Sequence, residues 1–444
     1  MKLNISNSLK KSELFQINPN CAGIDIGAKE IFVSIGDKKV RQFSTYTPDL
    51  KKIIKWLKSE SIEIAAMEST GVYWIPLYEM LADQGIIPVL ANTKNIKNVS
   101  GRKTDVSDAE WLCTLLRYGL IAGAFRPKAE ILELRGYVRQ RSLLIEHRAP
   151  HILHIDKALI QMNLRLSNVI SDIMGMSGMK IIRAIINGQR DPKVLAMLCH
   201  ERCKNPTEII MESLEGHYKE DQVFALKQAV EAYDFYTRQI EDCENRIEQM
   251  LKKIAPPVDN LPTKKEKRNA SKNAYQFDAW GLAYSLAGAD LTKIDGINEQ
   301  TAVLILSEIG TDMSCWPSEK NFTSWIGLCP DNKVSGGKVL KNRTKRSRSR
   351  IKQAFKLAAF ALHSSKSALG AYFRKMRAKH GVEKAITATA HKLARLVYRM
   401  LKYGEAYVDI GSEEYEKRQK ERILKGLRKK AAEHGFDLIK KIAA

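Results

Sequence analysis

The sequence has no apolar stretch near the ~18–20 residues that a membrane-spanning helix needs, so we expect no membrane partner. Cysteine is scarce: there are seven in 444 residues, an odd number, and no signal peptide precedes them. This pattern indicates reduced thiols in a cytoplasmic protein and argues against a disulfide framework. Cys199 and Cys203 lie close together, but no second pair follows at the spacing of a structural zinc site, so zinc is disfavoured.

Acidic residues are also few: the chain has 50 Asp and Glu but 73 Lys and Arg, which gives a net charge of +23. The excess gathers in residues 333–352, which hold nine basic residues and no acid. Such a run is commonly a solvated loop. A polyanionic partner is the more economical interpretation, because the run lies between a Ser-Gly-Gly turn and an apolar helix at 354–362. The candidate nucleic-acid-binding residues are Lys333, Lys338, Lys341, Arg343, Lys345, Arg346, Arg348 and Arg350 in the run, with Arg102 and Lys103 before it.

Four acids are the candidate metal ligands. Asp25 interrupts the apolar run 21–27, and Glu68 ends the apolar run 62–68. Asp105 and Asp108 are three residues apart at the start of a predicted helix, which puts both carboxylates on one helical face. Acids among apolar residues are costly unless paired or metal-bound, and hard oxygen ligands suit Mg²⁺ or, as a substitute, Mn²⁺. In the plainer interpretation, the two helical acids cap the helix and Asp25 is a turn residue beside glycine.

The order of predicted elements around these acids favours metal chemistry. Periodicity predicts strands at 21–27, 30–36 and 40–44, a helix at 48–59, a strand at 62–68, a helix at 73–81, a strand at 86–91 and then the Asp108 helix. This is the order found in ribonuclease-H-like domains, including the RuvC type that resolves Holliday junctions. Proteins of that fold place acids on the first strand, at the end of the fourth strand and on a late helix.

Two runs, 66–77 (Ala-Met-Glu-Ser-Thr-Gly-Val-Tyr-Trp-Ile-Pro-Leu) and 98–109, carry a specific resemblance. They resemble the DEDD transposases of bacterial insertion sequences, the group called insertion-sequence family one-ten, and the spacing suggests its eleven-eleven branch. The resemblance implies that the four acids are Asp25, Glu68, Asp105 and Asp108. It implies a DNA transposase or recombinase that mobilises its own element by Mg²⁺-dependent strand cleavage and rejoining.

The resemblance resumes at residues 291–310, where members of the family enter their second conserved domain. The tight connection 295–298 and the apolar helix that ends at Gly310 resemble a helix-hairpin-helix. Backbone amides near Gly296 and Asn298 could then receive a DNA phosphate. An ordinary helical hairpin that packs the core is the equal alternative.

Ser335 lies in the run 325–338, before two glycines that would let a DNA backbone approach closely. By chemistry alone this Ser-Gly is a flexible turn. The resemblance implies instead that Ser335 is the nucleophile, since family members carry a Ser-Gly here and use that serine. No histidine lies nearby in sequence to act as a base, so activation would come from the metal site.

Two stretches, 131–162 and 218–254, predict long helices that form either a coiled-coil dimerising arm or an ordinary bundle. The expected fold is α/β plus α, with a ribonuclease-H/RuvC-like domain, a helical middle region and a mostly helical C-terminal transposase domain. The expected boundaries are an N-terminal extension at 1–18, the RuvC-like domain at 19–128, the helical region at 129–256, a linker at 257–284, the transposase domain at 285–408 and a basic, exposed helical tail at 409–444.

The partners that the resemblance implies are donor and target DNA and a structured noncoding RNA, the bridge RNA, that guides the reaction. A homodimer or homotetramer follows because two donor and two target ends must meet, and the bacterial cytoplasm with its nucleoid is the expected place. Two other functions stay open. One is a RuvC-like, structure-selective endonuclease that uses water as the nucleophile, and the other is a non-catalytic nucleic-acid-binding scaffold.

Overall fold

The computed structural model describes residues 15–69, 71–91, 105–121, 123–258, 261–263, 272–344, 349–404 and 409–439, excluding the side chains of 331, 333, 334, 339 and 341–343. The chain divides into a first unit, residues 1–126, and a second unit, residues 127–444. Within the described ranges, no helix combines the length and the apolar character that crossing a bilayer requires.

The first unit is built on one mixed sheet of five strands in the order β3-β2-β1-β4-β5. The strands are β1 (Cys21–Ile26), β2 (Glu30–Ser34), β3 (Arg41–Ser44), β4 (Ile64–Glu68) and β5 (Ile87–Ala91). The helices are α1 (Thr47–Ser59), α2 (Trp74–Asp83) and α4 (Asp105–Arg117). β2 is antiparallel to both β1 and β3, whereas β1, β4 and β5 run parallel.

Alternation of side chains along the strands gives the sheet two buried faces. Ile24 of β1 and Met67 of β4 face α1 and α2 in one apolar cluster, to which α1 contributes its buried stripe of Leu50, Ile53 and Leu57. Their neighbours Cys21 and Ala66 face the other way and pack against α4 through Cys113 and Leu116. The strands are therefore apolar on both sides, as parallel strands covered by helices must be.

The predicted order of strands and helices in this unit is confirmed, with each described boundary within about two residues of the expected one. The mixed sheet and its strand order are consistent with a ribonuclease-H-like domain. The order also determines where the acids go, because β1, β4 and β5 end at the same edge of the sheet.

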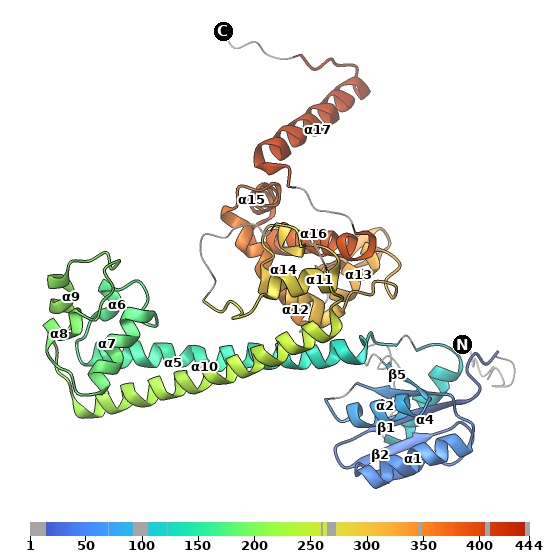
Figure 1. The fold of residues 1–444 in the computed structure, drawn as a ribbon. Coiled ribbons are helices and arrows are strands. Elements are labelled where there is room, and N and C mark those ends of the chain that lie inside the picture. The colour runs from blue at the N-terminus through green and yellow to red at the C-terminus, as the bar shows by residue number, and fades with distance from the viewer. Residues whose placement is uncertain are drawn as a thin grey trace, which may run out of the picture. The chain divides into compact units, whose positions relative to one another are not determined.

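The second unit begins with two long helices, α5 (Ala129–Gln161) and α10 (Glu220–Ile254), which lie side by side (Figure 1). They run antiparallel, because Arg141 contacts Glu244 while Arg148 contacts Thr237. The Arg141–Glu244 pair is buried, with 2.8 Å from Nε to Oε1, and Tyr275 lies under the guanidinium at 4.1 Å. The two predicted long helices are thus confirmed, and they pack on each other within one chain.

Four short helices fill the segment between the two long ones, and the sequence analysis predicted none of them. They are α6 (Leu166–Val169), α7 (Met176–Ile186), α8 (Pro192–Ala196) and α9 (Thr207–Ser213). Their apolar faces share one core with Ile155 and Leu159 of α5 and Leu226 of α10. The segment therefore forms a small helical head at the end of the helical pair, as Figure 1 shows.

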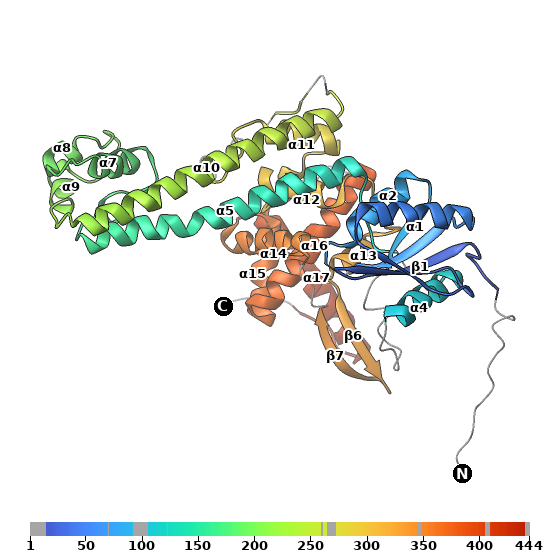
Figure 2. The ribbon, with the colours of Figure 1, turned by 90° about the horizontal axis from the view of Figure 1, so that it is seen from below.

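The remainder of the second unit is mostly helical, as predicted, with one added hairpin (Figure 2). Its helices are α11 (Ala279–Ala287), η2 (Leu291–Lys293), α12 (Glu299–Ile309), α13 (Glu319–Ile326), α14 (Arg350–Ala361), η3 (Leu362–Ser364), α15 (Ala368–His380), α16 (Val382–Tyr403) and α17 (Gly411–Glu433), and the hairpin strands are β6 (Pro330–Ser335) and β7 (Lys338–Thr344). Phe322, Phe355 and Tyr398 are fully buried at its centre.

Two features of this part differ from expectation. Residues 279–284, which the sequence analysis assigned to a linker, lie in α11, where Trp280 is buried and donates from Nε1 to Asp290. The Ser335 turn is the end of a strand pair rather than an isolated loop. The exposed tail helix, by contrast, is confirmed over α17, in which no residue is buried.

Candidate active site

Asp25 and Glu68 are brought together by the register of the central strands. β1 pairs in parallel with β4 so that Ile24 lies opposite Met67. The next residue on each strand is therefore level with its neighbour, and both side chains point to the same face. Because neighbouring strands are about 4.8 Å apart, the two carboxylates lie side by side at the end of the sheet.

That face is the one covered by α4, and Gly23 explains how closely the helix approaches. A Cβ atom at Gly23 would lie 2.2 Å from the carbonyl oxygen of Ala109 and 2.2 Å from the amide nitrogen of Cys113. Two residues earlier, the sulfur of Cys21 lies 3.9 Å from that of Cys113. The backbone of α4 thus packs directly on the β1 backbone over positions 21 and 23, and Asp25 is the next position on this face.

Asp105 and Asp108 occupy the first turn of α4; Asp108 directly precedes Ala109, and Asp105 lies one helical turn before it. Because Ala109 lies against Gly23, that first turn reaches toward the end of β1 that carries Asp25. Asp105 is exposed, whereas Asp25, Glu68 and Asp108 are half-buried. The four acids, spread over 84 positions of sequence, therefore gather at one edge of the sheet on one face.

The pKa of Asp25 also reflects the closeness of the other three acids. The pKa of its carboxyl is raised from 3.8 to about 6, mainly by burial and then by the charges of Asp105, Asp108 and Glu68 in that order. A carboxylate ionises reluctantly when it loses water and faces other negative charges. The cluster therefore carries an excess of negative charge that a bound cation would neutralise.

A divalent metal fits this cluster by chemistry. Within the described ranges, no three His, Cys, Asp or Glu side chains are close enough to hold one ion as they stand. Ligation needs oxygens within about 2–2.6 Å of the ion, whereas repulsion between carboxylates acts over several ångströms. Hard oxygen donors and surplus negative charge suit Mg²⁺ or Mn²⁺. Among the described residues, no third His, Cys, Asp or Glu joins Cys199 and Cys203 to form a metal site, and all seven cysteines are free thiols.

Gly23 is the positioning residue that the sequence analysis missed. The signal was present, because a glycine inside a buried strand commonly marks a close approach of another backbone. In its plainer interpretation of Asp25, the sequence analysis took the neighbouring glycine as a sign of a turn. The structure shows that Gly23 admits α4, and with it Asp105 and Asp108.

Ser335 is the last residue of β6 and pairs with Lys338, the first residue of β7. Gly336 and Gly337 connect the strands with φ of +54° and +76°, which is the left-handed geometry of a tight two-residue hairpin turn. Ser335 and both glycines are exposed, and a Cβ at either glycine would have no atom within 4 Å. The hydroxyl of Ser335 is therefore presented at an open corner of the hairpin.

The basic run continues from this corner. Lys338 is exposed on β7, and Arg350 is exposed as the first residue of α14. The other candidates lie outside the described residues: Lys345, Arg346, Arg348, Arg102 and Lys103 entirely, and Lys333, Lys341 and Arg343 as side chains. Two of the predicted cations are thus placed on the solvent side of the strand and helix that follow Ser335.

The structure assigns Gly296 and Asn298 packing and capping roles. Gly296 has φ of +90°, and a Cβ there would lie 2.6 Å from the carbonyl oxygen of Ala358 on α14. The Asn298 side chain caps α12 by accepting a hydrogen bond from the Thr301 amide at 2.8 Å. These contacts favour the ordinary helical hairpin among the two alternatives. The predicted end of α12 at Gly310 is confirmed.

Two protein-family models match the chain. A model described as transposase, of the DEDD group of IS110 elements, matches residues 22–164. A second model, described as transposase of the IS116/IS110/IS902 family, matches residues 288–374. Together they cover about half of the chain. No curated protein matches it.

The two matches divide the candidate residues in the expected way. The first contains all four acids of the cluster, and the second contains Ser335 and the basic run that follows it. The topology of the first unit and the clustering of the acids agree with the first match. The chain therefore belongs to the IS110 family of DEDD transposases, a class of enzymes that cut and rejoin DNA.

Proposed function

We propose that the chain mobilises an insertion sequence by metal-dependent cleavage and rejoining of DNA through a serine nucleophile, guided by a structured noncoding RNA. The observation that carries this proposal is the gathering of Asp25, Glu68, Asp105 and Asp108 on one face of the sheet. Four carboxylates held together at the cost of mutual repulsion have a functional reason, because stability alone would disfavour the arrangement.

In the proposed site, Asp25 and Glu68 on the sheet and Asp105 and Asp108 on α4 hold one or two Mg²⁺ ions. When bound, Mg²⁺ polarises the scissile phosphate and stabilises the charge that develops during transfer. The rigid elements that carry the acids fix the positions of these ligands. β1 and α4 are locked by backbone contact at Gly23, so binding an ion would require the acidic side chains, and not the elements that carry them, to move.

The proposed nucleophile is Ser335. Its Oγ forms a bond to phosphorus, the bond to one strand oxygen breaks, and that oxygen leaves with a proton as a free hydroxyl. The phosphoserine link conserves the energy of the phosphodiester, so a hydroxyl of the partner strand can reverse the step and rejoin the ends. The exposed hairpin corner supports this role, because its glycines leave room for a DNA backbone.

The partners in this proposal are donor DNA, target DNA and the bridge RNA, with a homodimer or homotetramer as the working unit. Lys338 and Arg350 supply phosphate contacts near Ser335, and such contacts position a nucleic acid without reading its sequence. Base pairing with the RNA would supply the specificity. The reaction takes place in the bacterial cytoplasm, at the nucleoid.

Covalent trapping tests this function. Purified protein is incubated with RNA transcribed from the flanks of its element, Mg²⁺, and labelled donor and target DNA, then denatured and run on a gel. We expect a protein-linked DNA band with the wild type that is lost with Ser335→Ala, with Asp25→Ala and when the RNA is omitted. Ser324→Ala removes another exposed serine of the second unit and is expected to leave the band intact.

The gel also distinguishes the two other functions. Free nicked DNA that survives Ser335→Ala but not Asp25→Ala would mean a water-using endonuclease. Retarded but uncut DNA with every variant would mean a binding scaffold. Either result would overturn the serine mechanism.

A further inference from the structure

The helices α1 and α2 lie parallel and begin at the edge of the sheet that carries the acids. α1 follows β3 and α2 follows β4, and both strands run in the direction of β1. Lys58 near the end of α1 donates to Gln84 just after α2, with 2.7 Å between Nζ and Oε1. The C-terminal ends of the two helices therefore lie side by side.

Exposed aromatic side chains lie where the two helices begin, at the active-site end. Tyr46 is 76% exposed, Val72 is 66% exposed and Tyr73 is 51% exposed. Tyr46 directly precedes α1 and Tyr73 directly precedes α2, and neither side chain caps its helix. The loop with Tyr46 is held near the end of β1, because Thr45 donates from its hydroxyl to the carbonyl of Ala28 at 3.4 Å. Two exposed rings at this edge of the sheet suggest a ligand with flat apolar faces.

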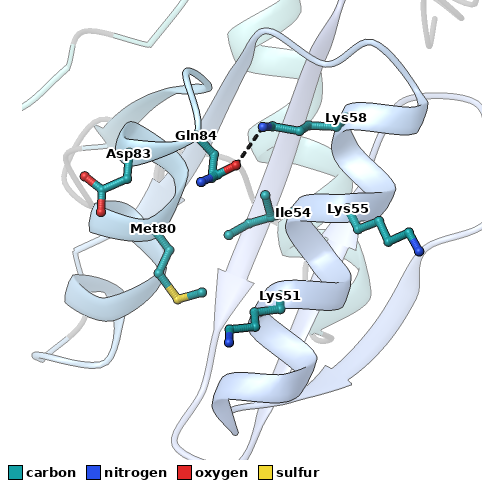
Figure 3. A pocket seen from close by; sticks show the side chains of 7 residues that line it. All are labelled: Lys51, Ile54, Lys55, Lys58, Met80, Asp83 and Gln84. Carbon is teal, nitrogen blue, oxygen red and sulfur yellow. Dashed lines mark hydrogen bonds between the residues drawn. The ribbon is translucent and has the colours of Figure 1, made fainter.

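A groove of about 430 Å³ lies between residues 51–58 of α1 and the last turn of α2 (Figure 3). Ile54 and Met80 line it, and three lysines of α1 stand along one side. Lys51, Lys55 and Lys58 recur at helical spacing and are exposed. The groove has one acid, Asp83, against these three ammonium groups. Its charge therefore suits an anionic, extended ligand.

We propose that this groove binds a single strand of nucleic acid, with Tyr46 and Tyr73 stacking on unpaired bases as the strand reaches the acids. The inference rests on the proposed function only for its class of ligand. It adds a binding track in the first unit, separate from the basic run that follows Ser335.

The dimensions and chemistry of the groove fit a strand. Lys51 and Lys58 are roughly 10 Å apart along the helix, at 1.5 Å per residue, so the row of ammonium groups is long enough to contact more than one phosphate of an extended strand. Lys51 and Lys55 form no ion pair with a described residue, so both ammonium groups are available to phosphate. Aromatic rings stack on any base once it leaves the helix, whereas a duplex hides its base faces.

The first test measures salt-dependent binding of a fluorescein-labelled oligothymidylate to the full chain carrying Asp25→Asn, in EDTA. Each lysine that contacts a phosphate contributes about 0.7 to the slope of log K against log salt for a single strand. We expect Lys51→Ala with Lys55→Ala to lower that slope by about 1.4. Lys52→Ala is the matched control on the same helix, because Lys52 lies outside the groove and pairs with Asp49.

The second test maps the contact directly. A strand carrying 5-bromodeoxyuridine is crosslinked by light, and the attached peptides are identified by mass spectrometry. We expect crosslinks at Tyr46 or Tyr73, and binding weaker by roughly 5- to 150-fold when either is changed to Ala, the usual range for a stacked base. Tyr46→Phe keeps the ring and is expected to bind as the wild type does.

An unchanged slope, or crosslinks confined to other peptides, would overturn the proposal, as would equal competition by duplex DNA. All the substituted side chains are exposed, so unchanged thermal unfolding separates lost binding from lost folding. Because no cleavage is needed, this proposal can fail while covalent trapping succeeds. Covalent trapping can likewise fail while the groove still binds a strand.

Discussion

The acidic cluster of the first unit and the Ser335 hairpin of the second are built in opposite ways. The acids stand on elements whose positions are set by buried backbone contacts at Gly23 and by strand register. Ser335 lies at an exposed corner, where a Cβ added at either turn glycine would meet no described atom within 4 Å. A metal site needs ligands held in place, whereas a nucleophile that attacks a large polymer needs open space around it.

This difference predicts which substitutions change stability and activity together and which change activity alone. Substitutions around the acids should alter folding and chemistry together, because core packing positions the ligands. Substitutions at the hairpin corner should alter chemistry alone.

The largest expected effect is that of Ser335→Ala on the covalent link to DNA, which we expect to vanish. The side chain is exposed, and surface changes of this kind usually alter stability by no more than about 0.5 kcal/mol. Gel trapping and urea denaturation, run on the same preparation, measure both quantities. If Ser335→Ala unfolds at a lower urea concentration than the wild type, the claim that the hairpin corner contributes little to stability is contradicted.

Gly23→Val should destabilise the first unit by about 1–3 kcal/mol or more, since its Cβ meets backbone atoms that cannot move aside. It should also abolish the metal response, because α4 carries Asp105 and Asp108. Thermal unfolding with and without Mg²⁺ measures both. Gly136→Ala, on α5 with no atom within 4 Å of the new Cβ, serves as the control and should be neutral or mildly stabilising. Wild-type stability in Gly23→Val would show that close packing is not what positions α4.

The Asp25 carboxyl makes stability depend on pH when no metal is present. Its pKa is about 6 in the folded state against about 3.9 in the unfolded state, so folding favours the protonated form. Below about pH 4 this carboxyl does not change the free energy of unfolding. As the pH rises toward 6 it destabilises the folded state, and it continues to do so above pH 6. After allowance for solvent screening, we expect the ionised carboxyl to lower the free energy of unfolding by about 1–2 kcal/mol.

Asp25→Asn should remove that loss and be more stable than the wild type at pH 8 in EDTA, yet equal to it near pH 4. Denaturation at the two pH values checks the sign. A variant less stable than the wild type at pH 8 would contradict the repulsion in the cluster.

The smallest expected effect concerns the turn after Ser335. Gly336→Asn should leave the hairpin intact, because Asn tolerates positive φ, whereas Gly336→Val should cost roughly 1–2 kcal/mol of local stability. The rate of covalent linkage should fall only with Val. Equal rates for the two variants would indicate that the hairpin geometry does not position the nucleophile.

Much of the first unit could be predicted from sequence because each element carries a local signal. The alternating runs of β1 and β4 and the stripe of Leu50, Ile53 and Leu57 on α1 report burial without knowledge of the fold. The order of elements then placed Asp25 and Glu68 at one sheet edge. The approach of α4 was not predictable, because it depends on Gly23 meeting Ala109, a contact 86 residues away.

Some features of the second unit carry no local signal in the sequence. The β6–β7 hairpin was missed because its strands are largely polar and show no apolar alternation. From sequence alone, Asn298 suits a phosphate contact and a helix cap equally well. The structure shows that it caps α12, because its side chain accepts a hydrogen bond from the Thr301 amide. The groove between α1 and the last turn of α2 was hidden for another reason, since it exists only where two separate helices lie together.

The most direct test of the account is a Mn²⁺ titration followed by electron paramagnetic resonance, in which the bound ion loses the signal of free Mn²⁺. The wild type should bind one or two ions, and Asp25→Asn and Glu68→Gln should each weaken binding by at least 10-fold. Asp83→Asn, which changes an acid at the far end of α2, should bind as the wild type does. Undiminished binding by Asp25→Asn would contradict the claim that the four acids form one metal site.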